Sequence, residues 1–395
     1  MSEPPPARKL GLWMSIALVV GNMIGSGIFL LPASLAPYGL NSIAGWILSA
    51  TGAVALAVVL SRLSRAFPAG GGPYAYTRAA FGPLAAFLVA WGYWINVWVG
   101  NAAIATGAVS YLVPFYARLG TAPHLSAAVV VAILWLLTAV NCAGVRAAGW
   151  VQGVTTVLKV MPLLAIAALG VFAVKLESVA GNAAVPFSLS AVTASATLTL
   201  FALLGLESAT IPDGKVANPE RTIPRATMIG TVVTALIYIL SCSTVLVLLP
   251  TAQLGSSNAP FADVARMFWG GTGAALVALA GAISGFGALN GWILLQGEVP
   301  YVMAKDGVFP RVFAKTSRRN TPVVALVFGS VLVTALVLLN AGQSTVRVFT
   351  FMVLLATSAC LVMYLVCSLA LLRLQRQGRL GGARRGTAGF ASIAV

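Results

Sequence analysis

Residues 21–29 read GNMIGSGIF and interrupt an apolar segment that is otherwise long enough to cross a membrane as a helix. A second interruption, FALLGLES at residues 201–208, contains the carboxylate of Glu207 within an equally apolar segment. Backbone groups inside a bilayer must be hydrogen-bonded by the protein itself, so an unwound turn there must line a cavity or bind something. Glycine-interrupted segments at matching positions in two halves of a chain indicate the substrate site of a secondary transporter.

The composition places this chain in a membrane. Hydrophobic residues make up 59% of it and charged residues 8%, and the mean hydropathy is +0.95. The net charge of +16, from 24 Lys and Arg against 8 Asp and Glu, would suggest a nucleic-acid partner in a soluble protein. Here we expect the charge to follow from membrane topology, and we predict the lipid bilayer as a partner and no nucleic acid.

The polar residues exclude several other classes of protein. The four cysteines form no C-x-x-C pair and the sequence has one histidine, so we predict no disulfide, no metal site and no cofactor. The sequence has no G-x-x-x-x-G-K-[ST] phosphate loop and no arrangement typical of a catalytic nucleophile. We therefore predict neither an ATP-driven pump nor an enzyme, and no catalytic residues.

The apolar segments predict an all-α polytopic membrane protein. Nineteen Lys and Arg fall in the loops on one side of these segments and four in the loops on the other. Because basic loops remain in the cytoplasm, both termini are predicted to be cytoplasmic. The ten predicted spans are 12–35, 43–66, 82–113, 126–143, 150–174, 189–211, 226–249, 272–297, 322–340 and 347–374.

The two interruptions can supply groups that bind an amino acid. Glycines on both sides of Ser26 allow the chain to leave helical geometry, and the amides that follow begin a half-helix whose positive end favours a carboxylate. Carbonyl oxygens freed by the unwinding can accept hydrogen bonds from an ammonium group. The alternative is a simple kink or a packing face of small residues, since Gly21 and Gly25 are four apart. The residues expected to contribute in this way are Met23, Gly25, Ser26, Gly27, Phe201 and Leu204.

The third segment adds a polar face. It carries two asparagines, Asn96 and Asn101. Burying an amide in hydrocarbon costs free energy unless the amide has a hydrogen-bond partner or faces a cavity. Trp94 and Trp98, four residues apart, we interpret as packing residues. The residues that share the polar face, at i, i+3, i+4, i+7 and i+8, are Tyr93, Asn96, Val97, Gly100 and Asn101.

Four motifs give the sequence a family resemblance. They are the first interruption, PAGGGPYAYTR at 68–78, NPERTIP at 218–224 and KDGVFP at 305–310. In this order they resemble the amino acid–polyamine–organocation superfamily, most closely the bacterial arginine/agmatine antiporter branch. The resemblance implies a transporter of the bacterial inner membrane that works by alternating access. It also implies one transporter domain over 1–374, an inverted repeat of five plus five segments (about 12–174 and 189–374), and discontinuous segments 1 and 6.

The resemblance also implies roles for individual residues. Residues matching Asn101, Phe201 and Trp292 line the substrate pocket of these antiporters, and Trp292 would stack on the substrate. Residues matching Glu207, Tyr93 and Tyr364 belong to an outer gate, and the one matching Tyr74 has been implicated in the pH response. The chain departs from the branch in having Phe201 in place of tryptophan and Asn96 in place of a small residue, so the substrate remains open.

Lys159 is a third departure from the branch. It lies deep in the fifth predicted segment, where an isolated lysine costs about 2.5–3.5 kcal/mol on insertion scales. Other members of the superfamily resemble this chain at the position of Lys159. In those members the resemblance implies that the ammonium group bridges segment 5 to the break in segment 1. Our hypothesis is that Lys159 holds the pocket closed and changes its protonation during the cycle; the alternative is snorkelling toward an interface.

Several functions remain open from the sequence. The leading hypothesis is a secondary amino acid antiporter with an amino acid or polyamine substrate. The alternatives are a proton-coupled neutral amino acid symporter that uses Lys159, a channel or sensor, and a truncated protein that does not transport. Residues 375–395 form a basic segment and the expected start of an eleventh helix. Segments 11 and 12 contribute to the homodimer of the antiporters that the chain resembles, so a homodimer is also left open.

Overall fold

The structure, a computed structural model, describes residues 11–67, 72–143, 145–173, 185–207, 216, 218–317 and 321–380. The side chains of residues 18, 26, 145–157 and 219 lie outside that description. The described ranges are built from helices and turns and contain no β-strand. This agrees with the predicted all-α class.

Each of the ten predicted segments coincides with helix in the described ranges. The first is split into α1 (Leu12–Met23) and α2 (Ser26–Leu35). The others overlap α3 (Asn41–Ala66), α5 (Pro83–Ser110), α7 (Pro123–Cys142), α8 (Val145–Ala173), α10 (Leu189–Ala202), α11 (Pro219–Leu248), α13 (Pro260–Lys305), α14 (Val323–Leu339) and α15 (Thr345–Arg376). Short helices connect them: η1 (Ala36–Tyr38), α4 (Gly72–Phe81), α6 (Arg118–Thr121), α12 (Thr251–Ser256) and η4 (Arg311–Ala314).

Six of the described helices are long and apolar enough to cross a membrane. The pair 12–23 and 27–38, bent by 43°, makes a seventh if it is counted as one span. The described apolar parts of α8, α10 and α14 are shorter. The protein is therefore an all-helical, multi-pass membrane protein. The full set of ten spans and the five-plus-five repeat stay predictions.

Proline and glycine set several helix boundaries. Proline is the first residue of α5, α7, α11 and α13, where its missing N–H has no intrahelical partner to lose. In α13, Gly270 has a positive φ (φ 66°, ψ −163°) and separates a short leading helix from the long one that follows. The long part begins where the span at 272–297 was predicted.

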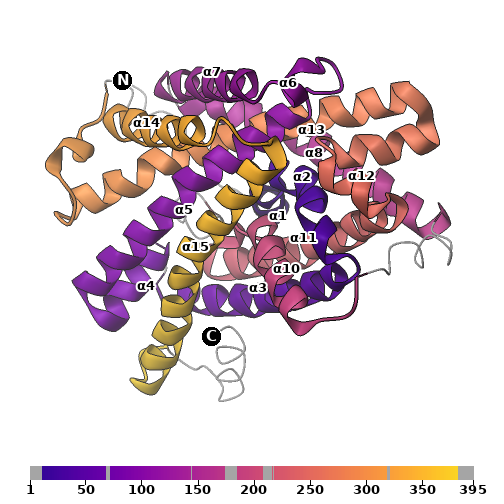
Figure 1. The fold of residues 1–395 in the computed structure, drawn as a ribbon. Helices are drawn as coiled ribbons and strands as arrows, with labels where there is room; N and C mark the ends of the chain where they lie inside the picture. The colour runs from indigo at the N-terminus through magenta and orange to yellow at the C-terminus, as the bar shows by residue number, and fades with distance from the viewer. Residues whose placement is uncertain are drawn as a thin grey trace.

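The interrupted first segment lies inside the bundle. Figure 1 shows α1 and α2 near the centre, with longer helices around them. α1 packs against α11, and α2 packs against α5 and α13, while α3 runs beside α10 and α11. One large cluster of buried apolar side chains extends from α1 to α15. The break between α1 and α2 therefore lies within the protein core.

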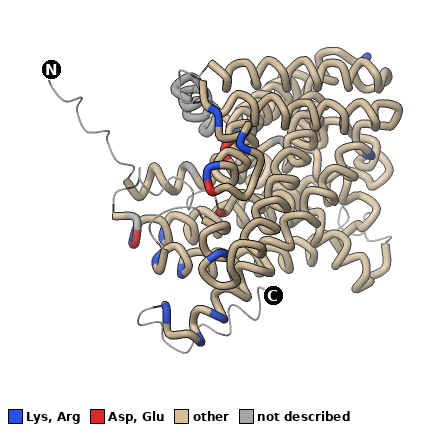
Figure 2. Tube along the Cα trace, turned by 90° about the vertical axis from the view of Figure 1, so that its left-hand side faces the viewer, with Lys and Arg blue, Asp and Glu red and all other residues tan. Residues whose placement is uncertain are grey.

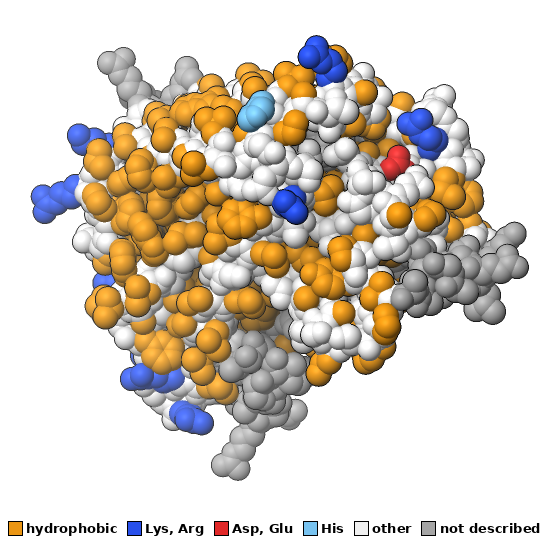
Figure 3. All heavy atoms as spheres, viewed as in Figure 1, with side chains coloured by type: hydrophobic (Ala, Val, Ile, Leu, Met, Phe, Trp, Pro, Cys, Tyr) orange, Lys and Arg blue, Asp and Glu red, His pale blue; other side chains and the backbone are white. Residues whose placement is uncertain are grey.

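The surface matches a lipid environment. Large apolar side chains are exposed along many helices, for example Leu236 (55%) and Leu339 (84%). Figure 3 shows apolar side chains over much of one face, with Lys and Arg mostly at its margins. Figure 2 shows most described Lys and Arg toward one end of the molecule and a few at the other. This distribution fits the predicted asymmetry of the loops.

Candidate functional site

The start of α2 presents backbone donors in the protein interior. Ile24 and Gly25 have extended backbone angles (ψ 97° and −172°), and no side chain caps α2. The first amides of a helix have no acceptor within it, and the helix dipole adds partial positive charge there. This end of α2 can therefore bind a carboxylate.

On the α1 side of the break, three side chains from distant helices donate hydrogen bonds to consecutive carbonyl oxygens. The bonds are Lys159 Nζ to Gly21 O (3.1 Å), Trp292 Nε1 to Asn22 O (3.3 Å) and Tyr238 Oη to Met23 O (2.8 Å). The expectation of an open Met23 carbonyl thus needs correction, because Tyr238 occupies one of its two acceptor positions. These three carbonyl oxygens are therefore hydrogen-bonded by the protein itself.

The second break approaches the first. The chain leaves α10 in a turn over Leu203–Gly205, and Gly205 has a positive φ of 98°. A Cβ atom at Gly205 would lie 3.3 Å from both Asn22 O and Trp292 Cζ2, so this close approach needs glycine. Residues 208–215, which follow the break, lie outside the described ranges.

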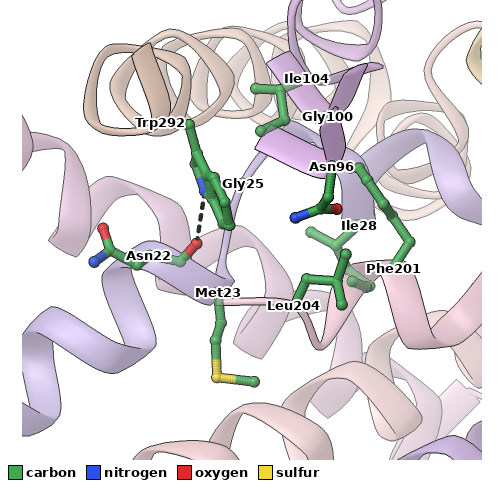
Figure 4. Close-up of a pocket in the computed structure, with 12 residues that line it drawn as sticks. Asn22, Met23, Gly25, Ile28, Asn96, Gly100, Ile104, Phe201, Leu204 and Trp292 are labelled. Carbon is green, nitrogen blue, oxygen red and sulfur yellow. Dashed lines mark hydrogen bonds between the residues drawn. The ribbon is translucent and has the colours of Figure 1, made fainter. Parts of the chain in front are cut away.

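A cavity lies beside the two breaks (Figure 4). Seven of the ten residues predicted to bind substrate line it: Met23, Gly25, Gly27, Asn96, Phe201, Leu204 and Trp292. The lining also includes Asn22, Ile28, Gly100, Ile104 and Ala202, which were not among those ten. Four of these five are adjacent in sequence to a predicted residue, and Ile104 lies one helical turn after Asn101. Including the residues within one helical turn of each predicted residue would therefore have identified all five.

Asn96 is the polar side chain of the cavity with unmet hydrogen-bonding capacity. It is 1% exposed, and neither its Nδ2 nor its Oδ1 has a hydrogen-bond partner among the residues that the structure describes. Figure 4 shows its amide pointing into the cavity between Trp292 and Phe201. A buried polar group without a partner costs about 1–3 kcal/mol, so a ligand that pairs with this amide recovers that free energy.

Two aromatic side chains form walls of the cavity. The bond from Trp292 Nε1 to Asn22 O fixes the indole ring, and the Phe201 ring packs edge-on against Phe349 with centroids 6.4 Å apart. A Cβ atom at Gly27 would lie 2.7 Å from Phe201 Cε1, so glycine at position 27 makes room for the ring. The ring faces offer cation–π or apolar contact to a substrate side chain.

Glu207 is held by the two tyrosines that the family resemblance assigned to a gate. Tyr93 Oη donates to Glu207 Oε1 (3.0 Å), and Tyr364 Oη and the Gly205 amide donate to Oε2 (2.9 and 3.2 Å). All three side chains are buried. The cluster joins α5 and α15 to the turn after α10, next to the cavity. The expected juxtaposition of these residues is present, and their role as a gate stays a prediction.

Lys159 is completely buried in α8 and reaches the first break through Gly21. Burial of the whole side chain rules out snorkelling to an interface. The lysine instead connects α8 to the last turn of α1, as the hypothesis of a bridge between segment 5 and the break requires.

Three predicted substrate-binding residues do not contribute side chains to the described cavity. Val97 and Asn101 are buried outside its lining, and the side chain of Ser26 lies outside the description. Asn101 Nδ2 instead donates to Gln296 Oε1 (2.8 Å), and Gln296 Nε2 donates to Ser330 Oγ (3.1 Å). Asn101 therefore links α5 to α13 and α14. The helical spacing placed it on the correct face but could not reveal a partner 195 residues away.

Tyr74 lies apart from the gate cluster, in α4 beside an ion pair between Arg78 and Asp306 (3.1 Å). Partial burial, and then the neighbouring Asp306 carboxylate, raise the pKa of the Tyr74 hydroxyl above its ordinary value. The hydroxyl is therefore protonated throughout the physiological pH range. A pH response at Tyr74 would have to operate through hydrogen bonding and not through its own ionisation.

An interrupted membrane helix beside a cavity that contains the Asn96 amide is typical of a multi-pass membrane transporter. The sequence profile described as amino acid permease matches residues 10–394, and the chain belongs to that family. The members of this family are transporters and not enzymes, which agrees with the prediction from the sequence.

Bacterial proteins are similar to the chain over most of its length. A Bacillus subtilis (strain 168) protein named as an arginine/ornithine antiporter is 34% identical over 403 residues, 94% of this chain and 85% of that protein. The cadaverine/lysine antiporter of Escherichia coli (strain K12) is 37% identical over 338 residues, 84% of this chain and 75% of its own. The putrescine transporter PotE of the same strain is 30% identical over 392 residues, 98% of this chain and 88% of its own.

Proposed function

We propose that this protein is an amino acid/polyamine antiporter that exchanges a basic amino acid for a related amine by alternating access. The observation that supports this most directly is the cavity at the two breaks, where α2 amides, an unpaired asparagine and two aromatic rings converge. The names of the relatives, which pair basic amino acids with each other or with diamines, favour the same class of substrate.

In the proposed binding mode, the two ends of the substrate bind different groups. The carboxylate binds the first amides of α2 near Gly25 and Gly27, and the α-ammonium binds backbone carbonyls beside the breaks. The side chain extends between Trp292 and Phe201 toward the amide of Asn96. Cation–π contact there contributes about 0.5–2 kcal/mol, and hydrogen bonds from the ammonium or guanidinium to Asn96 Oδ1 add to it.

The absence of a carboxylate from the described cavity lining favours a substrate with a lower net positive charge. No Asp or Glu is among the described residues that line the cavity, and Glu207 already accepts three hydrogen bonds outside the lining. A basic amino acid has a net charge of +1 and its decarboxylated amine +2, and only the amino acid has a carboxylate that can bind the first amides of α2. We therefore expect tighter binding of the amino acid than of its decarboxylation product.

The remaining parts of the proposal concern architecture. Residues 12–174 and 189–374 form the two inverted repeats, and the Glu207 cluster acts as the gate that joins the second break to α5 and α15. Both termini are cytoplasmic, and a homodimer is compatible with the proposal without being needed for it.

Proton-coupled symport of a neutral amino acid is the second candidate function. The bond between Lys159 Nζ and Gly21 O favours it, because loss of a proton from this buried ammonium would change the contact between α8 and the unwound end of α1. The mechanism then needs no counter-substrate, which makes the two candidates separable.

Uptake of radiolabelled arginine, lysine and ornithine into proteoliposomes tests both candidates. The antiporter predicts uptake only when the vesicles contain a basic amino acid, cadaverine, putrescine or agmatine. Uptake of a neutral amino acid into empty vesicles under a proton gradient would support the symporter instead. Trp292→Leu should abolish exchange, while Trp13→Leu, a matched change at a tryptophan that is 79% exposed, should leave it intact. No uptake of any of these compounds by the wild type contradicts both candidates.

A further inference from the structure

A second hollow lies away from the substrate cavity, between the end of α3 and the start of α11. It has a volume of about 350 Å³ and is lined by Arg65, Arg221, Arg225 and Glu220. Arg65 is in the last turn of α3, and the other three residues are in the first two turns of α11. Nothing in the proposed transport mechanism uses it.

The hollow has an excess of positive charge. Three guanidinium groups face one carboxylate, and Arg221 and Arg225 are four residues apart on one helix, where like charges repel. Within the part of the chain that the structure describes, none of the three guanidinium groups forms an ion pair or a side-chain hydrogen bond. The start of α11 adds the positive end of a helix dipole. Such a hollow favours an anion with several acceptor oxygens, above all a phosphate group.

Helix packing holds the arginines in place. Ser61 Oγ donates to Pro224 O (3.4 Å), joining α3 to α11 beside the hollow. Ile223 and Ala226 are buried on the inner side of α11, while Arg221 and Arg225 are exposed on the outer side. The guanidinium groups therefore project from a rigid helix pair.

The face of α11 above the hollow is apolar and exposed. Ile229 (41% exposed), Val232 (38%) and Leu236 (55%) follow Arg225 at i+4, i+7 and i+11, so they share its side of the helix. At 1.5 Å per residue, this stripe extends about 16 Å from Arg225, close to half of a hydrocarbon core of about 30 Å. A phosphate held by the arginines would thus have an apolar surface of one leaflet's depth directly above it.

We propose that Arg65, Arg221 and Arg225 bind the phosphate of an anionic phospholipid, whose acyl chain lies along the exposed face of α11. Basic pockets at the cytoplasmic ends of membrane helices bind lipid head groups in this way. The apolar stripe distinguishes a lipid from a soluble phosphate, because only the lipid has a chain to cover it.

Thermal unfolding of the delipidated protein in detergent tests the proposal. The probes are dioleoyl phosphatidylglycerol, dioleoyl phosphatidylcholine and inorganic phosphate. Phosphatidylglycerol should raise the melting temperature with a saturable dependence, and the other two should not. Each arginine near a membrane surface contributes about 1 kcal/mol, so R65Q/R221Q/R225Q should bind phosphatidylglycerol about 100-fold more weakly. Arg376→Gln, which removes an exposed arginine at the end of α15, should bind it as the wild type does.

Three results would overturn the proposal. The first is an equal response of the wild type to the two phospholipids, and the second is an unchanged affinity in the triple variant. The third is an equal response to inorganic phosphate, which would assign the hollow to a soluble anion. Should the triple variant fail to fold, the single variant Arg225→Gln is tested in its place. We expect it to bind phosphatidylglycerol about fivefold more weakly than the wild type does.

Discussion

Replacing Asn96 by leucine should make the protein more stable and weaken substrate binding at the same time. Leucine keeps the branched shape of asparagine and removes both unpaired polar atoms, Nδ2 and Oδ1. In the absence of substrate these atoms are buried and have no partner in the described part of the chain, so their removal relieves a penalty. In the presence of substrate the amide is predicted to be hydrogen-bonded, so its removal costs affinity.

The two effects have comparable sizes. Relief of an unsatisfied buried amide is worth about 1–3 kcal/mol. For a chain of this size that corresponds to a rise in melting temperature of roughly 1–4 °C. Loss of a hydrogen bond to a charged substrate group costs about 1.5–3 kcal/mol, or about a 10- to 150-fold weaker Kd.

Thermal unfolding of purified Asn96→Leu, with and without increasing concentrations of the best exchange substrate, measures both quantities in one experiment. Ser284→Ala is the matched control, because its hydroxyl is also buried without a partner but lies outside the cavity lining. It should stabilise the protein and leave substrate binding unchanged. A lower melting temperature for Asn96→Leu, or a Kd equal to that of the wild type, would refute the role of Asn96 argued above.

Three further substitutions test other parts of the site. Gly27→Ala should lower substrate affinity at least about tenfold, because the added Cβ would lie 2.7 Å from the Phe201 ring. Adding Phe201→Ala should restore part of the lost affinity, and no recovery in the double variant would contradict this steric explanation. Tyr364→Phe removes a donor to Glu207 and should destabilise the protein by about 1.5–3 kcal/mol in thermal unfolding, whereas an unchanged melting temperature would mean that the bond contributes nothing. Lys159→Met should impair transport in proteoliposomes; normal transport by this variant across the pH range would exclude a role for the lysine in the cycle.

Much of the architecture follows from local sequence. The helical segments were predictable because each membrane crossing needs about 20 apolar residues, and the structure has helix in all ten predicted positions. The first break was predictable for a similarly local reason, since GSG at 25–27 can leave the helix and α1 does end at Met23. Boundaries at the ends were less accurate: α11 begins at Pro219, seven residues before the predicted span, because its first two turns are polar.

The partners of the polar side chains depended on tertiary packing. Spacing placed Asn96 and Asn101 on one face of α5, but it could not tell which of them meets the cavity and which meets Gln296. The carbonyl oxygens at the end of α1 likewise bind three side chains that are each more than 130 residues away in sequence.

The sequence by itself determined that this protein is a multi-pass helical transporter, where its first helix breaks, and which family it belongs to, because hydropathy, glycine placement and short motifs are properties of neighbouring residues. Only the tertiary structure decided that Asn96 is left unpaired in the cavity, that Tyr238 occupies the Met23 carbonyl, and that three arginines surround a hollow below an apolar face of α11. The physical reason is that the rotation and depth of each helix are set by how all of the helices pack together, and these determine which of several chemically equivalent groups come within hydrogen-bonding distance.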